Sequence, residues 1–402
     1  MSPLFWIALA SASAWCWLVL AHGFFWLTDP PLPACSPPAA WPDVAVVVPA
    51  RDEAAVLPVS LPSLLAQDYP GRTEVVLVDD GSSDGTGALA RALGDAHGGP
   101  PVRKRAAVLT VCSPGEPEPG WTGKLWAMRH GIAVARSRMP DVRYLLLTDA
   151  DIEHEPGSLR ALVAAAESED LDLVSLMARL RVATAWERLI VPAFVYFFAQ
   201  LYPFRRVNRA GARTAAAAGG CVLLRDDATA RAGVPGSIRG AVIDDVSLAR
   251  AVKRSGGRIR LGLADGVRSV RPYPGLGELW RMVSRSAYAQ LGHSPPVLVG
   301  AVAALAVVYL APPVAVAAGA WSGDGAAAAA GGCAWALMTT TYLPMLRHYR
   351  QPLWLAPALP FTALLYLLMT VDSAVQHARG RGAAWKGRTY ARPGAARESA
   401  GG

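Results

Sequence analysis

The pattern of hydrophobic and polar residues changes twice along the chain. Between Val44 and about Ala264, short apolar runs rich in β-branched residues alternate with longer, Ala-rich stretches. The runs predict strands at Val44–Val48, Val75–Val78, Ala107–Val111 and Tyr144–Thr148, and the stretches between them predict helices at Ala54–Ala66, Thr86–Leu93 and Gly123–Ala135. Continuously apolar strands separated by helices indicate an α/β domain with a largely parallel sheet, buried on both faces. In such sheets, ligands bind beyond the carboxyl ends of the strands.

The amino-terminal flank of this region has the composition of a membrane segment. Residues 1–28 contain no Lys, Arg, Asp or Glu, and Leu4–Leu27 is long enough to cross a hydrocarbon layer of ~30 Å as a helix. A cleaved signal peptide is the alternative, but the segment lacks a positive amino-terminal region and its apolar part is too long. We therefore expect a retained transmembrane anchor at residues 1–28 and a Pro-rich linker at residues 29–43, followed by the α/β domain at residues 44–294.

The carboxyl-terminal flank is apolar as well. Membrane segments are expected within residues 295–375, at Val297–Ala320, Ala326–Leu346 and Leu353–Val371, before a basic tail at residues 376–402. The basic loop between the last two segments favours the cytoplasm, and so does the tail. Three full crossings from a cytoplasmic domain would leave the tail outside. The conflict is removed if one segment is re-entrant, and Leu353–Val371, which contains two prolines, is the candidate.

An aromatic-rich run within the α/β region, Arg188–Phe204, has two open interpretations. It is interrupted by Pro192 and is too short to predict a membrane span on its own. It is either a core helix or an element at the membrane interface, where aromatic residues and the basic segment that follows would both be favoured.

Composition agrees with a protein that lies partly in lipid. Hydrophobic residues make up 52% of the chain and charged residues 17%, whereas soluble domains are usually about a quarter charged. The net charge of +8 suits a protein that faces anionic lipid head groups or nucleotide phosphates. Nucleic acid is disfavoured as a partner, because no basic stripe is interleaved with aromatic residues. The five cysteines include no CxxC pair and indicate neither a disulfide framework nor a zinc site.

Acidic residues gather where three of the predicted strands end. The sequences concerned end in Arg51-Asp52-Glu53, in Asp79-Asp80 and in Asp149-Ala150-Asp151. Adjacent carboxylates repel one another and resist desolvation unless a cation or hydrogen-bond donors compensate them. Oxygen ligands of this kind suit Mg²⁺ or Mn²⁺, which would also bridge a diphosphate. Asp and Gly are common turn formers as well, but three such clusters at successive strand ends favour a ligand site.

In combination, VVVPARDEA, VVLVDDGSSDGT and LLLTDADIEHEPGSL resemble the family 2 glycosyltransferases of the GT-A fold, over roughly Val44–Gly292. The resemblance implies a nucleotide-diphospho-sugar donor, with a UDP-sugar preferred. Glu53 and Asp80 match positions that contact the base and ribose in that family, and Pro49 and Arg51 are assigned to the same donor site.

The resemblance also assigns a metal and a phosphate contact. Asp149 and Asp151 match the family's DxD motif, which holds a divalent metal, Mg²⁺ or Mn²⁺, against the diphosphate. The segment GWTGKLWAMRHG places Gly123 and Lys124 where a loop meets a helix, and a helix N-terminus with a nearby ammonium group favours phosphate. A Trp-rich packing turn is the alternative. The GWTGK pattern is similar to that of glycosyltransferases that act on polyisoprenoid lipids such as carotenoids.

Two further segments resemble the acceptor side of the family. In GAVIDDVSLARAVKRSG, Asp244 stands where the family's ED motif has Glu, and Asp245 matches the catalytic base of inverting members. The alternative for this pair is an N-terminal cap of the helix that follows. The segment Gly219–Ala228 resembles the acceptor-site segment of the family, and its two glycines would allow close approach of a substrate.

The segment LWRMVSRSAYAQL departs from the family's QxxRW motif. Met282 replaces Gln and Ser286 replaces Trp, while Arg285 is retained. Because polymer synthases of the family use the lost residues to hold a growing sugar chain, the resemblance implies a single transfer. Arg281 and Arg285 would lie on one face of a helix and could both contact the diphosphate. A solvated basic face is the alternative.

The order of anchor, GT-A domain and apolar carboxyl-terminal part most closely resembles the hopene-associated glycosyltransferases of bacteria. The tail motif WKGRTY at residues 385–390 recurs in membrane-anchored lipid glycosyltransferases. The resemblance implies a multi-pass enzyme of the bacterial inner membrane with a cytoplasmic catalytic domain. It would move a sugar, with inversion, to a lipid acceptor such as a hopanoid or another isoprenoid. A processive polysaccharide synthase and a non-catalytic membrane scaffold stay open as alternatives. A dinucleotide oxidoreductase is disfavoured, because no GxGxxG follows the first strand.

Overall fold

The computed structural model describes residues 1–28, 32, 35–97, 107–380, 384–385 and 388–389. The chain divides into two compact units. The sheet unit consists of residues 29–181, 207–272 and 384–402, and the helical unit consists of residues 1–28, 182–206 and 273–383. Parts of the expected Pro-rich linker, of the basic tail and of its WKGRTY motif lie outside the described residues.

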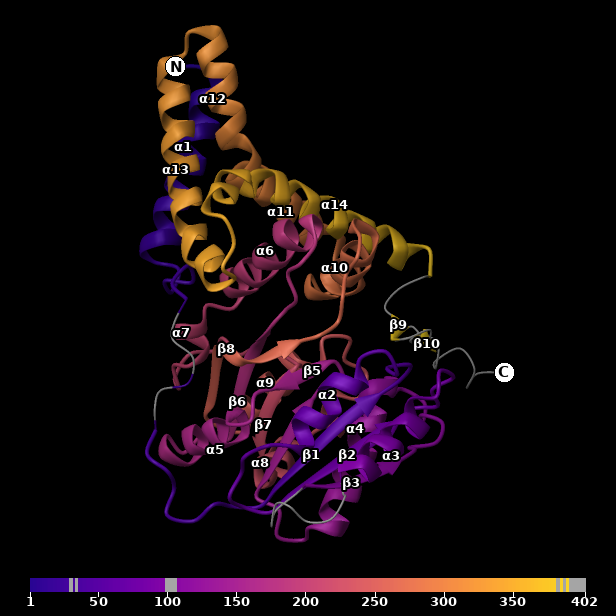
Figure 1. Ribbon diagram of the computed structural model, residues 1–402. Helices are drawn as coiled ribbons and strands as arrows, with labels where there is room; N and C mark the ends of the chain where they lie inside the picture. The colour runs from indigo at the N-terminus through magenta and orange to yellow at the C-terminus, as the bar shows by residue number, and fades with distance from the viewer. Residues whose placement is uncertain (29–31, 33–34, 98–106, 381–383, 386–387, 390–402) are drawn as a thin grey trace, which may run out of the picture. The chain divides into compact units, whose positions relative to one another are not determined.

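An eight-stranded sheet forms the centre of the sheet unit, in the order β3-β2-β1-β4-β7-β6-β8-β5 (Figure 1). The strands are β1 (Val44–Ala50), β2 (Thr73–Asp79), β3 (Val108–Cys112), β4 (Tyr144–Thr148), β5 (Ile152–His154), β6 (Leu173–Arg179), β7 (Cys221–Arg225) and β8 (Ile259–Ser269). The first four strands in this order are parallel, as their apolar runs predict. In the other half β6 and β8 are also parallel, but β7 is antiparallel to both of its neighbours and β5 is antiparallel to β8, so the expectation of a largely parallel sheet holds only in part. The sheet is therefore mixed.

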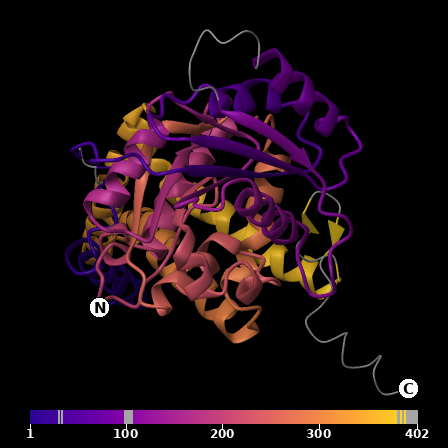
Figure 2. The same cartoon turned by 90° about the horizontal axis from the view of Figure 1, so that it is seen from below.

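Helices lie on both faces of this sheet (Figure 2). They are α2 (Leu57–Leu65), α3 (Thr86–His97), α4 (Gly123–Arg138), α5 (Ser158–Ser168), α8 (Asp226–Ala232) and α9 (Asp244–Arg254), with a short 3₁₀ turn, η1 (Gly236–Ile238). Alternate side chains of β1 pack on opposite faces of the sheet, as expected for a strand that is buried on both sides. Val46 and Val48 belong to the hydrophobic core that includes α2 and α5, whereas Val47 meets Gly131 of α4. A Cβ atom at residue 131 would lie 2.5 Å from Val47 Cγ1, so the glycine permits the close approach of helix and strand.

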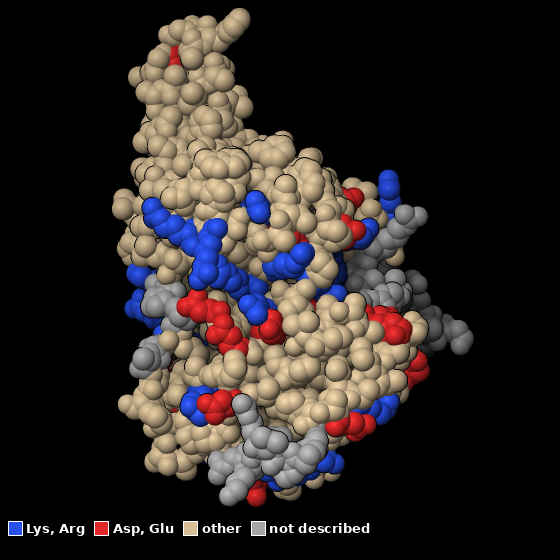
Figure 3. All heavy atoms as spheres, viewed as in Figure 1, with Lys and Arg blue, Asp and Glu red and all other residues tan. Residues whose placement is uncertain are grey.

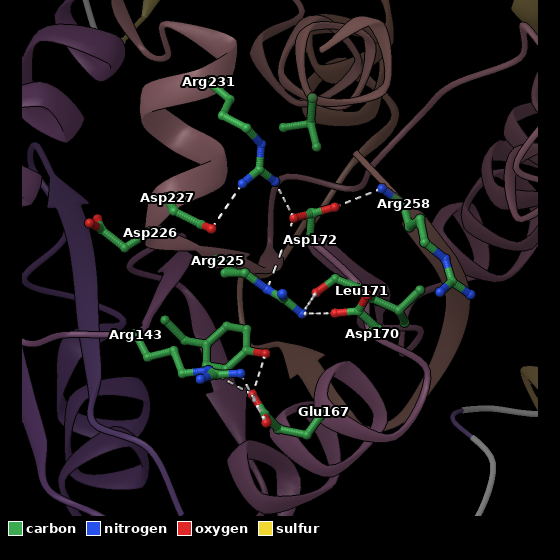
Figure 4. Close-up of polar contacts among 12 residues, drawn as sticks. Arg143, Glu167, Asp170, Leu171, Asp172, Arg225, Asp226, Asp227, Arg231 and Arg258 are labelled. Carbon is green, nitrogen blue, oxygen red and sulfur yellow. Dashed lines mark hydrogen bonds and ion pairs between the residues drawn. The ribbon is translucent and has the colours of Figure 1, made fainter. Parts of the chain in front are cut away.

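A network of charged residues ties the sheet unit together away from the acidic strand ends (Figure 4). Its centre is Asp172, a buried residue immediately before β6. The Asp172 carboxylate accepts hydrogen bonds from the Arg231 guanidinium and from the backbone N–H of Arg258 at 2.9 Å, and lies 4.0 Å from Arg225 Nε. Arg225 ends β7 at the level of Tyr144, where β4 begins. The network therefore lies at the opposite ends of the strands from Asp80 and Asp149.

The helical unit contains α1 (Pro3–Leu20), α6 (Ala185–Leu201), α10 (Leu276–Gln290), α11 (Pro295–Leu305), the π-helical turn η2 (Ala306–Leu310), α12 (Ala311–Ser322), α13 (Gly325–His348), the 3₁₀ turn η3 (Leu353–Ala358) and α14 (Leu359–Ala378). A short helix, α7 (Phe204–Val207), ends where the sheet unit resumes. The aromatic-rich run of the sequence forms most of α6, which begins at a capping box of Thr184 and Glu187. It contains Pro192 and buries Ile190, Val191 and Tyr196.

Among the described residues, three helices have the length and apolar composition to cross a membrane. They are Pro3–Leu20, Pro295–Ser322 and Leu353–Ala378. The second expected carboxyl-terminal segment, Ala326–Leu346, lies in α13, which is not one of the three because its Gly and Thr residues reduce its mean hydropathy. On the face seen in Figure 3, the surface formed by α1, α12 and α13 carries almost no charged side chains.

The amino-terminal helix is built into the helical unit by polar contacts as well as by apolar packing. α1 packs against α12 and α13. The indole N–H of Trp15 donates a hydrogen bond to the main-chain carbonyl of Val308 at 2.8 Å, and the buried Ser11 hydroxyl donates to the same oxygen at 3.4 Å. Val308 lies in the π-helical turn, where the backbone hydrogen-bond pattern of the helix is shifted. The two side chains therefore satisfy a carbonyl at an irregular point of a long apolar helix.

Candidate active site

The loops after β1 and β2 lie against each other, and several of their carboxylates act as turn formers. Asp79 Oδ1 accepts a hydrogen bond from the N–H of Ser82 at 3.0 Å, and Asp52 Oδ1 accepts one from the N–H of Ser83 at 2.8 Å. Asp84 Oδ1 accepts from the N–H of Thr86 at 3.0 Å, at the start of α3. The contacts of Asp79 and Asp84 are local hydrogen bonds that Asp side chains make in turns, whereas the contact of Asp52 joins the two loops. They account for Asp79 and Asp84 of the DDGSSDG segment, and for Asp52 of the preceding loop, without a ligand.

Asp80 differs from these turn formers, because its carboxylate is buried. Its side chain is fully inaccessible and lies 3.5 Å from the Arg51 guanidinium, which also donates to the main-chain carbonyl of Asp80. The N–H of Asp80 donates to the carbonyl of Ala50 at 2.9 Å and so continues the pairing of β1 with β2. Pro49 is a buried residue of β1, one residue before this pairing ends. The fold thus brings together Arg51 and Asp80, two of the residues assigned to the donor site. The contact of Pro49 with a donor stays a prediction.

A partly buried lysine joins the end of β4 to the start of α9. Lys124 is the second residue of α4, whose N-cap Thr122 accepts a hydrogen bond from the N–H of Leu125 at 3.4 Å. The Lys124 ammonium lies 2.8 Å from Asp149 Oδ1 and 3.0 Å from Asp244 Oδ2. Burial by itself would lower the pKa of Lys124, but the two carboxylates outweigh it and hold the pKa above its ordinary value. Lys124 is therefore a permanent positive charge shared by Asp149, at the end of β4, and Asp244, at the start of α9.

Asp245 is held as an acceptor of hydrogen bonds. Its Oδ2 accepts from the N–H of Gly219 at 3.0 Å, and its Oδ1 accepts from the N–H of Val246 at 2.7 Å. Burial and the neighbouring carboxylate of Asp244 raise the pKa of Asp245 to about 6, against the opposing effects of Lys124 and the two backbone N–H groups. An acid with this pKa is ionised at neutral pH and is basic enough to accept a proton.

The local structure separates Asp245 from an ordinary helix cap. The N-cap of α9 is Ile243, which makes no side-chain capping bond, and Asp244 and Asp245 are the first two residues of the helix. One oxygen of Asp245 accepts a hydrogen bond from the N–H of Val246 in the first turn of the helix. The other accepts a hydrogen bond from the N–H of Gly219, which is distant in sequence. A Cβ atom at residue 219 would lie 3.5 Å from Asp245 Oδ2 and 3.4 Å from Lys124 Nζ. The expected acceptor-site segment is thus in contact with Asp245.

The second acid of the DxD motif is bound by two residues that sequence reasoning missed. Asp151 Oδ2 accepts hydrogen bonds from the Ser269 hydroxyl at 2.7 Å and from Arg271 Nε at 3.2 Å. A terminal nitrogen of Arg271 lies 2.7 and 2.6 Å from the two carboxylate oxygens of Glu53. Ser269 ends β8, so both residues follow the rule that polar groups gather at one edge of the sheet. The signal was present, but β8 itself was not predicted.

The remaining site residues expected from the sequence are in the other unit. Arg281 and Arg285 lie on α10 of the helical unit and are exposed. Arg281 forms an ion pair with Glu278 at 3.1 Å, as residues three apart on a helix do. Their contact with a diphosphate stays a prediction.

The two acids of the DxD motif fit a divalent cation that is shared with a substrate. Within the described part of the chain, no group of three or more His, Cys, Asp or Glu residues could hold a metal by itself. Mg²⁺ and Mn²⁺ at phosphate-transfer sites are commonly bound by one or two carboxylates, with phosphate oxygens and waters completing the coordination. Asp149 and Asp151, which are separated by one residue, supply such oxygens. Each also contacts a protein cation, Lys124 and Arg271 respectively.

Comparison with known proteins identifies the family of the chain. Residues 42–289 match the family described as "Glycosyltransferase like family 2". The chain belongs to this family. It is a glycosyltransferase, and its mixed sheet with helices on both faces is a GT-A-like α/β fold. No curated protein matches the sequence.

Several solved structures resemble this family 2 glycosyltransferase, and the first of them supports its fold. The mannosyltransferase PcManGT from Pyrobaculum calidifontis, in complex with GDP-Man and Mn²⁺, is similar over 93% of this chain and 99% of its own, with a TM-score of 0.55 and 21% identity. Glucosyl-3-phosphoglycerate synthase from Mycobacterium tuberculosis, in complex with Mn²⁺ and UDP-glucose, is 17% identical over 63% of this chain and 79% of its own, with a TM-score of 0.39. TarS of S. aureus is 16% identical over 62% of this chain and 40% of its own, with a TM-score of 0.38.

Proposed function

We propose that this glycosyltransferase moves one sugar, with inversion, from a nucleotide-diphospho-sugar to a hydroxyl group of a membrane lipid. The observation that carries the proposal is the environment of Asp245. Its carboxylate is partly buried, is fixed by the N–H groups of Gly219 and Val246, and has a pKa raised to about 6. A base fixed in this way is suited to a single in-line displacement, in which the acceptor attacks the sugar from the face opposite the leaving group.

The donor would occupy the edge of the sheet that contains Arg51, Glu53 and Asp80. Carboxylates suit the hydroxyl groups of a ribose and the N–H groups of a base, because ionised acids accept hydrogen bonds. A UDP-sugar is the expected donor, and a GDP-sugar is the alternative suggested by the ligand of PcManGT. The bridge formed by Lys124 between Asp149 and Asp244 would place a positive charge between the diphosphate and the catalytic acid.

In the proposed reaction, Asp245 accepts the proton of the acceptor hydroxyl as its oxygen forms a bond to the anomeric carbon. The bond between that carbon and the diphosphate oxygen breaks, and the nucleoside diphosphate leaves with the electron pair. Lys124 stabilises the charge that develops on the leaving group. Mg²⁺ or Mn²⁺ held by Asp149 and Asp151 would supply further positive charge at the diphosphate.

A lipid acceptor is supported by the composition of the chain outside the sheet unit. Three apolar helices have the length to cross a membrane, and the visible surface of α1, α12 and α13 is almost uncharged. A hydrophobic acceptor could then enter from the bilayer, and a hopanoid or another isoprenoid is the class that the sequence resemblance favours. The proposed location is the inner membrane of a bacterium, with several crossings and the sheet unit in the cytoplasm.

Transfer of one sugar is favoured over processive synthesis by the replacement of the QxxRW motif. Met282 and Ser286, both on α10, stand where polymer synthases have Gln and Trp. A polysaccharide product of many units, formed without a lipid-soluble intermediate, would support the synthase instead.

The experiment uses the full-length protein in detergent or nanodiscs, with labelled UDP- and GDP-sugars and a bacterial lipid extract. We expect a labelled glycolipid, and we expect Asp245→Asn to reduce its formation by about 10²–10⁴-fold. The matched control is Asp227→Asn, because Asp226 and Asp227 begin α8 as Asp244 and Asp245 begin α9. Mass spectrometry of lipids from a deletion strain would identify the acceptor. Nucleotide-sugar binding with no transfer to any lipid would favour the scaffold alternative.

A further inference from the structure

Arg271 lies where it could influence the binding of a divalent cation in the donor site. The inference drawn from this position rests on the proposed function of that site. We propose that Arg271 is a positioning residue that neutralises Asp151 in the cation-free enzyme and competes with the divalent cation for that carboxylate. Arg271 therefore sets the cation concentration at which the donor site is loaded.

The contacts of Arg271 make it a cation tethered within the acidic site. Its Nε lies 3.2 Å from Asp151 Oδ2, and one terminal nitrogen lies within 2.7 Å of both oxygens of Glu53. The side chains of Arg271, Asp151 and Glu53 are 27%, 13% and 8% exposed, so water screens these contacts only partly. A guanidinium group stays protonated at every pH at which the protein is folded. The positive charge beside Asp151 is therefore permanent.

The same oxygen of Asp151 also accepts the hydrogen bond from Ser269. A metal ion bound to the Asp151 carboxylate would lie a few ångströms from the positive charge of Arg271. Like charges at that separation in a partly buried site repel each other strongly. Cation binding and the contact between Arg271 and Asp151 thus oppose each other.

Glu53 gives Arg271 an anchor that does not depend on Asp151. The contact with Glu53 uses a terminal nitrogen, whereas the contact with Asp151 uses Nε. If the contact with Asp151 is lost, the contact with Glu53 is still available. The guanidinium group of Arg271 therefore remains in the site when a metal ion binds Asp151. Glu53 is also the residue assigned to the nucleoside, and Arg271 thereby links the nucleoside end of the donor site to its metal end.

Arg268, which lies on β8 three residues before Arg271, supplies a matched control. It forms a bidentate ion pair with Glu153 at 2.7 and 3.1 Å, its side chain is 60% exposed, and Glu153 is not a site residue. Replacement of Arg268 removes one arginine and one ion pair from β8 without changing the charge beside Asp151.

The test measures the binding of Mn²⁺ to the full-length protein without nucleotide, by electron paramagnetic resonance of the free ion. We expect Arg271→Gln to bind Mn²⁺ at least about tenfold more tightly than the wild type, because a neighbouring positive charge has been removed. Arg268→Gln is expected to bind within about twofold of the wild type, since exposed charges act weakly at a distance. Arg271→Lys, which keeps the charge but lacks the fork, should lie between Arg271→Gln and the wild type.

A thermal melt of each variant separates this role from a merely structural one. Without metal, Arg271→Gln leaves Asp151 and Glu53 without their shared cation and should lower the Tm. Added Mn²⁺ should raise the Tm of this variant more than that of the wild type, as tighter binding to the folded state requires. If the Tm falls while Mn²⁺ affinity stays at the wild-type value or weakens, Arg271 is only a structural residue and the inference is overturned.

Asp151→Asn distinguishes failure of this inference from failure of the proposed metal site. Loss of Mn²⁺ binding in Asp151→Asn, together with unchanged affinity in Arg271→Gln, overturns the inference and leaves the metal site in place. Wild-type Mn²⁺ affinity in Asp151→Asn overturns both, because the cation would then bind elsewhere.

Discussion

The ammonium group of Lys124 lies 3.0 Å from the carboxylate of Asp244, the acid next to the proposed catalytic base. Its second partner, Asp149, is the first acid of the DxD motif. One partly buried cation therefore holds Asp149, at the end of β4, against the start of α9. The enzyme has this bridge before any substrate is bound, so the charge that would meet the leaving diphosphate is already in place.

The bridge predicts a large effect of Lys124→Met on turnover. Removal of a preorganised positive charge should lower kcat by about 10²–10³-fold, the usual effect of losing one donor that stabilises developing negative charge. Lys124→Arg should retain more activity, because it keeps the charge. Steady-state transfer assays on the two variants check this prediction, and equal losses in both would show that geometry, rather than charge, is what Lys124 supplies.

The raised pKa of Asp245 predicts the acid limb of the pH profile. A proton acceptor works only when it is ionised, so kcat/KM should fall as the pH drops through about 6. Since Asp244 helps to raise this pKa, Asp244→Asn should move the limb to lower pH. The measurement is the transfer rate at saturating metal between pH 4.5 and 8.5. A rate that is constant from pH 5 to 7 would contradict the assignment of Asp245 as the base.

The contact between α4 and the sheet predicts that Gly131→Ala destabilises the sheet unit. The added methyl group would lie 2.5 Å from Val47 and 2.8 Å from Val78, so the helix or the strands must shift. Overpacking of this kind costs about 1–3 kcal/mol. Gly236→Ala is the control, because nothing lies within 4 Å of its added Cβ atom. Chemical denaturation followed by tryptophan fluorescence compares the two, and equal stabilities would show that the contact relaxes freely.

The network around Asp172 predicts a loss of stability that is separate from catalysis. Asp172→Ala leaves Arg231 and the N–H of Arg258 without their buried acceptor, and hydrogen bonds to a charged group are worth about 1.5–3 kcal/mol each (Figure 4). Asp227→Ala, which removes the exposed partner of Arg231, should cost less than about 1 kcal/mol. The protein that remains folded should keep its kcat in both variants. A reduced kcat in Asp172→Ala at full folding would connect the network to the site.

The sequence was sufficient to predict the parallel half of the sheet and most of the acids at its edge. β1, β2 and β4 contain continuous apolar runs. Such a run predicts a buried parallel strand from the local sequence alone, because both faces of the strand are buried. The position of Lys124 at the start of a helix could be predicted for a similar reason. A threonine N-cap, a glycine and a basic residue in succession form a local sequence signal.

What the sequence did not reveal depends on contacts between distant segments. β8 contains Gly262, Asp265 and Gly266, which interrupt its apolar run, so the residues at its end were not recognised as strand-end residues. The antiparallel direction of β7 depends on its place between β4 and β6. The different structural roles of neighbouring acidic residues also cannot be predicted from the sequence. Asp79 and Asp80 are adjacent, yet the first forms a turn and the second is buried beside Arg51.

The hydrogen bond from Trp15 to the carbonyl of Val308 has a practical consequence for anyone who wishes to shorten this protein. Deletion of the first 28 residues to obtain a soluble fragment would uncover the apolar surface of α13 and leave that carbonyl without its indole donor. Such a fragment would still need detergent and would melt at a lower temperature than the intact enzyme. Purification tags are therefore better placed at the carboxyl terminus, and the first helix is better kept.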